Sequence, residues 1–324
     1  MRSVSFLRGV VFALALLLAS LPAEAQPSGR VARIGHLSTT PPTAAPDAWT
    51  AFLQELAALG WAEGRTLRIE GRYGPVPRFP ELARELVALD VDVIVAGGGM
   101  PGVQAARDAT ARIPIVALGV ADQVVRNLAR PEGNITGVTT QSWDISEKRV
   151  QLLREAVPHA ARLGVLWEPN NPGSVSQLRE IESGARKLGV ELRAYAIRGP
   201  ADLEGAFLAM ARDGIGGVVV PPFHWSHAER HRLAQLALQH RLPALFGPRH
   251  FAEAGGLMSF GANLPALLRR AAHQVDRLLR GAKPVDVPVE QPMKFDLVLN
   301  LRTAKALGLT IPPAVLARVD EVIE

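Results

Sequence analysis

Three glycines in VDVIVAGGGMPGVQAARDA (91–109) have the spacing G-x-G-x-x-G, at Gly97, Gly99 and Gly102. A continuous apolar run precedes them and a helical pattern follows, so they lie where a strand passes into a helix. Glycine lets the backbone approach a ligand closely, and a helix N-terminus offers N–H groups without a partner in the helix. Such a loop binds anions, and a phosphate, a pyrophosphate or a carboxylate would satisfy it.

A dinucleotide is one candidate anion, because Asp122 follows Gly102 at the distance expected of a ribose-binding acid. The position of the glycines disfavours this reading, since they follow the third expected strand and not the first. Pro101 also removes one N–H donor from the loop, and no Walker Lys-Ser/Thr pair follows. A glycine turn with a purely structural role is the remaining alternative, but we favour a loop that holds a carboxylate.

Short polar and aromatic side chains follow several other expected strands. The carboxyl ends of parallel strands meet at one edge of a sheet, so these side chains would together line a ligand cleft. Each alone is also ordinary turn chemistry, as in the Asn-Pro pair at 171–172. We predict a ligand site formed by Ser38, Thr39, Gly98, Gly99, Met100, Asp122, Ser142, Trp143, Asn170, Phe223, His224 and Trp225.

Patterns for catalysis and metal binding are weak. The chain has no G-x-S-x-G elbow, and no serine lies beside a recognisable His and Asp set. His227 and His231 would share a helix face, but the H-E-x-x-H order is absent. The chain has no cysteine, which excludes disulfides, thiolate metal sites and a cysteine nucleophile. We predict binding without catalysis, and neither a metal nor a cofactor.

Composition and the first residues bear on location. The formal net charge is +5, and basic residues are scattered singly, as at Arg149, Arg154 and Arg162, so nucleic acid is not an expected partner. The segment MRSVSFLRGVVFALALLLASLPAEA (1–25) has a basic start, a short apolar run and a small-x-small end. This pattern predicts a cleaved export signal and a periplasmic protein, with a retained anchor as the alternative.

The elements that must position the site alternate between strand and helix. The first half has expected strands at 31–37, 66–73, 91–96, 113–119 and 134–140, and helices at 47–60 and 79–90. The second half has expected helices at 145–157, 174–190, 201–213 and 227–241, and strands at 161–169, 191–197, 216–222, 242–247 and 255–261. Alternation of this kind predicts parallel sheets covered by helices.

The layout predicts an α/β protein of two similar Rossmann-like lobes joined by a hinge with several crossings. A helix at 264–281 and a strand at 294–300 follow the second set, so the chain revisits both lobes. We assign 1–25 to the signal peptide. Lobe 1 consists of 26–141 plus about 263–290, and lobe 2 consists of 142–262 plus about 291–324. The sequence does not decide to which of the two lobes the C-terminal strand belongs.

Over nearly its whole length the chain resembles the ABC-transporter substrate-binding proteins of the tryptophan/tyrosine type. The resemblance is carried by LAALGWAEGRTLRIEGRYG, ELARELVALDVDVIVAGGG, RIPIVALGVADQV, LARPEGNITGVTT, KRVQLLREAVP, LWEPNNPGS, LPALFGPRHFAEAGGLMSFGANL and KFDLVLNLRTAKALGLTIPP. It implies the type I periplasmic-binding-protein fold, capture of a small solute between two closing lobes, and delivery to a membrane permease with its ATPase.

The resemblance also assigns loops and side chains. The binding loops of the family correspond to Gly97–Met100, Val120–Gln123 and 168–171. Family members often have Asp-Pro-Val in the second of these, where this chain has Asp-Gln-Val at 122–124. Aromatic amino-acid ligands of the family would suit Trp143, Phe223 and Trp225 as stacking surfaces.

We therefore predict the periplasmic component of an ABC importer, a monomer that captures an amino acid or an aromatic or organic acid between its lobes. Glycine-loop amides and the hydroxyls of Ser38 and Ser142 would hold the carboxylate, and Asp122 would hold an ammonium. An exported sensor for a signalling partner and, less favoured, a secreted α/β enzyme are the alternatives. DNA-binding repressors of the same fold are disfavoured, because the export signal occupies the place of their helix-turn-helix.

Overall fold

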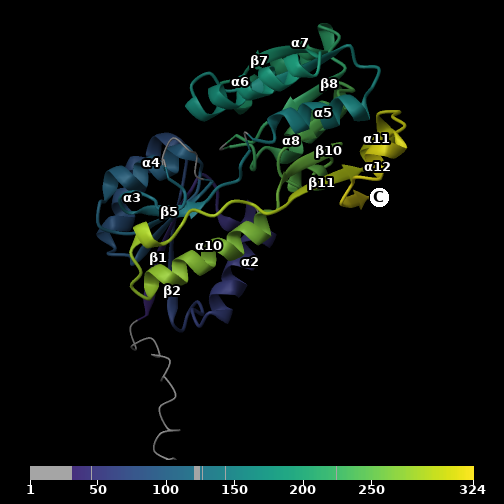
Figure 1. Cartoon of the computed structure of the whole chain (residues 1–324). Helices are drawn as coiled ribbons and strands as arrows, with labels where there is room; N and C mark the ends of the chain where they lie inside the picture. Colours follow the sequence, from purple (N-terminus) through teal and green to yellow (C-terminus); the bar gives the residue numbers. More distant parts are fainter. Residues whose placement is uncertain (1–30, 45, 120–124, 126, 143, 224) are drawn as a thin grey trace, which may run out of the picture. The chain divides into compact units, whose positions relative to one another are not determined.

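The first sheet is parallel and five-stranded. The structure is a computed structural model, which describes residues 31–44, 46–119, 125, 127–142, 144–223 and 225–324. The strand order is β2-β1-β3-β4-β5 (Figure 1). These strands are β1 (Ala32–Ser38), β2 (Leu67–Tyr73), β3 (Val93–Ala96), β4 (Ile115–Leu118) and β5 (Ile135–Val138).

The second sheet has seven strands in the order β12-β11-β10-β9-β8-β6-β7. β11 runs antiparallel to β10 and parallel to β12, and the other pairs are parallel. The strands are β6 (Arg162–Trp167), β7 (Glu191–Ala196), β8 (Gly217–Val220), β9 (Ala244–Phe246), β10 (Met258–Ala262), β11 (Phe295–Asn300) and β12 (Glu321–Ile323). Each strand expected from the sequence is present with slightly shifted ends, and β12 was not foreseen.

Helices cover both faces of the first sheet. α2 (Pro46–Ala58) and α10 (Leu264–Leu279) lie side by side on one face, and α3 (Phe79–Ala88) and α4 (Met100–Ala109) cover the other (Figure 1). Alternate residues of β3 enter the two cores. Val93 and Val95 join the core of α2 and α10, whereas Ile94 joins that of α3 and α4. Burial on both faces explains why this strand reads as continuously apolar.

The second sheet is covered in the same way. α5 (Ser146–Ala156), α6 (Pro172–Lys187), α11 (Leu301–Ala306) and α12 (Pro313–Leu316) pack on one core. The other core takes α7 (Leu203–Arg212), α8 (Arg230–Gln239) and α9 (His250–Glu253). Short 3₁₀ turns complete the chain: η1 (Pro42–Ala44), η2 (Val76–Arg78), η3 (Pro200–Asp202) and η4 (Pro284–Asp286). The predicted fold class of two Rossmann-like lobes is confirmed.

The helix predicted at 227–241 begins at Arg230 instead. Ser226 Oγ accepts a hydrogen bond from the Phe223 N–H at 3.0 Å and donates to the Phe223 carbonyl at 2.8 Å. A serine that bonds its neighbouring backbone in this way competes with the helix. His227 therefore lies in a turn before α8, and it does not share a helix face with His231.

The chain passes between the sheets several times. It leaves the first sheet after β5, returns from β10 to α10, and leaves again before β11. The last crossing is tied to the first, because Glu290 N–H donates to the Gly137 carbonyl at 3.0 Å and Thr139 N–H donates to the Glu290 carbonyl at 2.9 Å. Gln274 Nε2 on α10 also donates to Gly137 and Pro288 carbonyls. The lobe boundaries given above stay a prediction.

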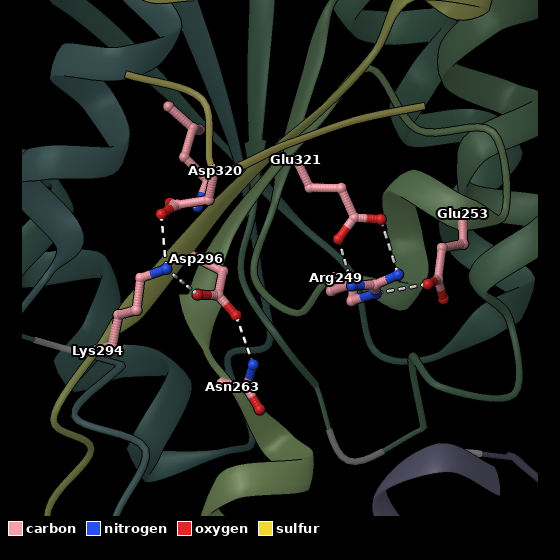
Figure 2. A network of polar contacts seen from close by, with 8 residues as sticks. Arg249, Glu253, Asn263, Lys294, Asp296, Asp320 and Glu321 are labelled. Carbon is pink, nitrogen blue, oxygen red and sulfur yellow. Dashed lines mark hydrogen bonds and ion pairs between the residues drawn. The ribbon is translucent and has the colours of Figure 1, made fainter. Parts of the chain in front are cut away.

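A polar network holds the C-terminal strand at the edge of the second sheet (Figure 2). Lys294 Nζ lies 2.7 Å from Asp320 and 3.3 Å from Asp296, which also accepts from Asn263 Nδ2 at 2.7 Å. Arg249 pairs with Glu253 and with Glu321 of β12. These contacts join β12 to β11, to the crossing before it and to α9.

Candidate functional site

A pocket of about 330 Å³ is lined by residues of both lobes. On the first lobe it lies at the carboxyl ends of β1 and β3, the edge of a parallel sheet where ligands are expected. On the second lobe it reaches the residues after β8 and β9 and the first turns of α6. Its volume is that of a site for a small solute.

The predicted site residues divide into three groups. Seven of them line the pocket: Ser38, Thr39, Gly98, Gly99, Met100, Ser142 and Phe223. Asp122, Trp143 and His224 lie outside the described residues. Asn170 and Trp225 do not line the pocket. Asn170 is exposed, and Trp225 stacks on Phe223 and donates through Nε1 to Glu168 Oε1 at 2.7 Å.

The glycine loop lines the pocket, and its glycines have backbone roles of their own. Gly98 and Gly99 have φ of 73° and 68°, in the left-handed region. A Cβ on Gly102 would lie 1.9 Å from the Gly97 carbonyl oxygen, so this glycine lets α4 approach the end of β3. Gly97 N–H donates to the Leu37 carbonyl at 2.7 Å. The G-x-G-x-x-G spacing is thus accounted for by turn geometry and packing, without a dinucleotide.

Arg149 is a pocket residue that the sequence reading took for an ordinary scattered charge. It lies on α5 and is only 2% exposed. Its Nε donates to the Phe260 carbonyl at 3.0 Å, and its Nη1 donates to Ser142 O and Oγ, each at 2.9 Å. Gln177 Nε2 donates to the same Ser142 Oγ at 3.0 Å. We refer to Ser142, Arg149 and Gln177 as the Arg149 cluster.

The second terminal nitrogen of Arg149 has no acceptor among the described residues. Nη2 lies beside Gly247, which also lines the pocket; a Cβ on Gly247 would come within 3.4 Å of it. The helix pattern carried a signal for this residue, because Arg149 lies four residues after Ile145 and four before Leu153, on the apolar stripe of α5. The apolar neighbours at this spacing agree with the burial of Arg149 in the structure.

The described residues that line the pocket carry a net positive charge. No Asp or Glu is among the described lining residues, and no described carboxylate forms an ion pair with Arg149. Burial lowers the pKa of Arg149 to about 9 because the charged form is desolvated, so the guanidinium stays protonated at neutral pH. A bound carboxylate would supply the missing counter-charge and accept charge-assisted hydrogen bonds.

The first-lobe side of the pocket is apolar and aromatic. Trp49 of α2 lines it, with the ring of His36 stacked on it at 4.2 Å between centroids. His36 Nδ1 lies 3.3 Å from Tyr73 Oη, and burial lowers the pKa of His36 to about 4, so its ring is neutral at pH 7. Further apolar lining on this side includes Ala48, Leu118, Val138, Leu264, Leu267 and Leu268.

The histidines after β8 form no metal site among the residues that the structure describes. His227 lines the pocket and stacks on His250 at 4.3 Å between ring centroids. Burial is the main cause that lowers the pKa of His227 to about 4 and that of His250 to about 2. His231 is exposed.

The chain matches a family model and resembles a protein that is named for the amino acid tyrosine. The model described as ABC transporter substrate binding protein matches residues 48–323. A tyrosine-binding protein of Clostridioides difficile (strain R20291) is 24% identical over 264 residues, which cover 80% of this chain and 75% of that protein. Across the described residues, no helix is at once long enough and apolar enough to cross a membrane.

Two solved structures superpose closely on this fold. A conserved domain protein from Vibrio cholerae has a TM-score of 0.83 at 27% identity, over 90% of this chain and 100% of that one. The ABC domain from Streptococcus pneumonia in complex with L-Trp has a TM-score of 0.82 at 24% identity, over 90% of this chain and 99% of that one.

Proposed function

The chain belongs to the family of ABC transporter substrate binding proteins, and on that premise we propose that it captures a small carboxylate-bearing solute for an importer. The family consists of binding components and not of enzymes, in agreement with the lack of a catalytic pattern in the sequence. The solute lies in the pocket, held between the Arg149 cluster and the apolar side of the first lobe.

The single observation that carries this proposal is the buried guanidinium of Arg149. Its Nη2 has no described acceptor, its charge has no described counter-ion, and it lines the pocket. A buried cation left without an anion is costly, so the site is completed by a ligand that brings one. A carboxylate accepts from Nη2, and the Ser142 hydroxyl and the glycine loop flank the same space.

The export pattern at 1–25 and the family support capture outside the cytoplasmic membrane. The solute-loaded protein then delivers its ligand to a membrane permease driven by an ATPase, and it acts as a monomer. The tyrosine-binding relative and the L-Trp complex support a ligand that bears a carboxylate and an aromatic group.

The test begins by identifying the solute. Protein purified from the periplasm without denaturation is extracted, and the extract is analysed by mass spectrometry; an organic acid or amino acid is expected. Calorimetry then compares Arg149→Met with wild type for that solute. Losing hydrogen bonds to a charged group costs about 1.5–3 kcal/mol each, so affinity falls about 10- to 150-fold.

Arg112→Met is the matched control, because the Arg112 side chain is 81% exposed and pairs with Asp90 on the surface. It should bind like wild type. If Arg149→Met does not fold, Arg149→Lys keeps the charge but loses the planar fork, and a smaller loss of affinity is expected. A folded Arg149→Met protein with wild-type affinity would overturn the proposal.

A further inference from the structure

The second-lobe wall of the pocket comes in large part from two loops that leave adjacent strands. β6 and β8 pair in parallel, so the loops that follow them begin side by side at one edge of the sheet. The lining includes Asn171, Gly173 and Ser174 from the first loop and the start of α6, and Pro222 and Phe223 from the second loop. The position of one loop relative to the other therefore sets the shape of this wall.

One buried carboxylate, that of Glu168, bonds to both loops. Glu168 follows β6 directly, is only 5% exposed and is not among the described lining residues. Its Oε1 accepts from Trp225 Nε1 at 2.7 Å, and its Oε2 accepts from Asn171 Nδ2 at 3.2 Å. Its backbone N–H donates to Ser174 Oγ at 2.8 Å. A single residue behind the wall thus joins the loop after β8 to the loop after β6.

The bond to Trp225 reaches the pocket through Phe223. The two rings are stacked, with centroids 5.2 Å apart and planes at 17° to each other. Phe223 lines the pocket and is 3% exposed, whereas Trp225 is not among the described lining residues. The hydrogen bond from Nε1 fixes the indole plane, and the indole face in turn limits the orientations open to the Phe223 ring. Glu168 therefore acts on an aromatic part of the wall without touching it.

The bond to Asn171 reaches the pocket through the start of α6. Asn171 Oδ1 accepts from the Gly173 N–H at 3.0 Å and from the Ser174 N–H at 3.4 Å, which caps the helix. The Nδ2 of the same amide donates to Glu168, so the amide cannot turn over without losing its cap and this bond together. The carboxylate thereby fixes the cap that places the first turn of α6 beside the pocket.

We propose that Glu168 is a positioning residue for solute binding, which sets the second-lobe wall of the pocket through Trp225 and Asn171 without contacting the solute. The inference rests on the proposed function, because it takes the pocket as the place where the solute binds. It adds to that function a residue behind the lining, whose hydrogen bonds fix the orientation of Phe223 and the start of α6.

Glu168→Gln tests the two bonds without changing the size of the side chain. An amide has one acceptor oxygen and a donor NH₂ group, so it cannot accept from Trp225 and Asn171 at once, and its NH₂ group faces one of these donors. Calorimetry measures the affinity for three probes: L-tyrosine, L-tryptophan and the compound extracted from the wild-type protein. We expect the probe that binds wild type to bind Glu168→Gln about five- to tenfold more weakly. A folded variant with wild-type affinity would overturn the proposal.

Trp225→Phe shows whether Glu168 acts through the indole. This variant keeps a ring beside Phe223 and removes the Nε1–H donor, so the amide of Glu168→Gln can then accept from Asn171 with no donor opposite its NH₂ group. In the Trp225→Phe background, Glu168→Gln should therefore cost less than about threefold in affinity. An equal loss in both backgrounds would overturn the proposal.

Trp225→Phe alone covers the case in which Glu168→Gln does not fold. It should weaken binding of the same probe by about threefold, although Trp225 is not among the described lining residues. Wild-type affinity in this variant would overturn the proposal.

Two control variants separate positioning from general destabilisation. Trp61 Nε1 donates to Asp276 at the same distance of 2.7 Å, and neither residue is among the described lining residues. Trp61→Phe should lower the free energy of unfolding and keep the wild-type affinity. Glu204→Gln, at an exposed position on α7, should change neither. A loss of affinity in Trp61→Phe as large as that in Trp225→Phe would contradict a specific role of Glu168.

These outcomes are separable from failure of the proposed function. If wild type binds none of the three probes, or if Arg149→Met binds as tightly as wild type, the proposed function fails and this inference fails with it. If Arg149→Met loses affinity while Glu168→Gln keeps it, the carboxylate site stands and only the role of Glu168 is overturned.

Discussion

Arg149 illustrates what a sequence tells about a single side chain and what it leaves out. Its place on the apolar stripe of α5 could be read from the sequence, but Arg149 was counted only as one of several singly scattered basic residues. Its partners are the Phe260 carbonyl, 111 residues away, and Ser142, which becomes a partner only through the path of the chain before α5. Seven pocket residues were predictable because strand ends meet at one edge; Arg149 needed the tertiary fold.

The buried His36 makes stability depend on pH. Its pKa is lowered from 6.5 to about 4 by burial, so between these values the unfolded chain takes up a proton that the folded chain does not. The free energy of unfolding therefore falls as pH drops through this window. His36 alone contributes roughly 2–3 kcal/mol of loss between pH 7 and about 4.5.

His36→Phe keeps a ring against Trp49 and removes the titrating group. Urea denaturation at the two pH values should show a smaller difference for this variant than for wild type. His159→Phe, at an exposed position, serves as the control and should keep the wild-type difference. An undiminished difference in His36→Phe would show that other groups cause the acid sensitivity.

At the scale of elements, the alternation of strand-like and helix-like segments predicted the long strands and helices. Where a predicted helix start was wrong, local hydrogen bonds are the cause. The Asn-Pro pair at 171–172 was interpreted as a turn starter; Asn171 is in fact the N-cap of α6 with Pro172 in its first turn. Ser226 delays the start of α8. The short elements α9, α11, α12 and β12 have too few residues for a period to be read, so packing alone defines them.

The close approach of α4 to β3 predicts a large effect of one methyl group. Gly102→Ala puts a Cβ 1.9 Å from the Gly97 carbonyl oxygen, so α4 must shift, and we expect a loss of about 3 kcal/mol in stability. Gly205→Ala in α7 meets nothing within 4 Å and should stabilise by about 0.5–1 kcal/mol. Equilibrium urea denaturation measures the free energy of unfolding of the two variants. Similar values for Gly102→Ala and Gly205→Ala would contradict the packing role of Gly102.

At the scale of the whole molecule, the sequence predicted two lobes from its two β-α series. It also predicted that the chain crosses repeatedly between the lobes, because a further helix and strand follow these series. It left open which sheet takes the last strand. β11 pairs antiparallel with β10, and β12 extends that edge, through contacts such as Leu297 N–H to Asp320 that join distant parts of the chain. Long-range pairing of this kind has no local pattern in the sequence.

The C-terminal strand protects the edge of the second sheet. Removing residues 321–324 deletes the three β11–β12 register pairs and leaves β11 as an open edge, so we expect about 1–3 kcal/mol of destabilisation and more aggregation. Denaturation and light scattering measure the two effects. Arg249→Met removes the half-exposed ion pairs with Glu253 and Glu321 and leaves the strand pairing in place, so it should cost less than about 1 kcal/mol. A truncated protein as stable and as dispersed as wild type would contradict this role.

The late position of α10 in the chain has a consequence for biogenesis. Leu267, Val275 and Leu278 cover the face of the first sheet that Ile34, Val93 and Val95 present, yet they are synthesised only after every strand from β6 to β10. A nascent chain that ends before residue 264 therefore leaves this apolar face of the first sheet uncovered. Until α10 emerges, that exposed apolar face favours aggregation and chaperone binding.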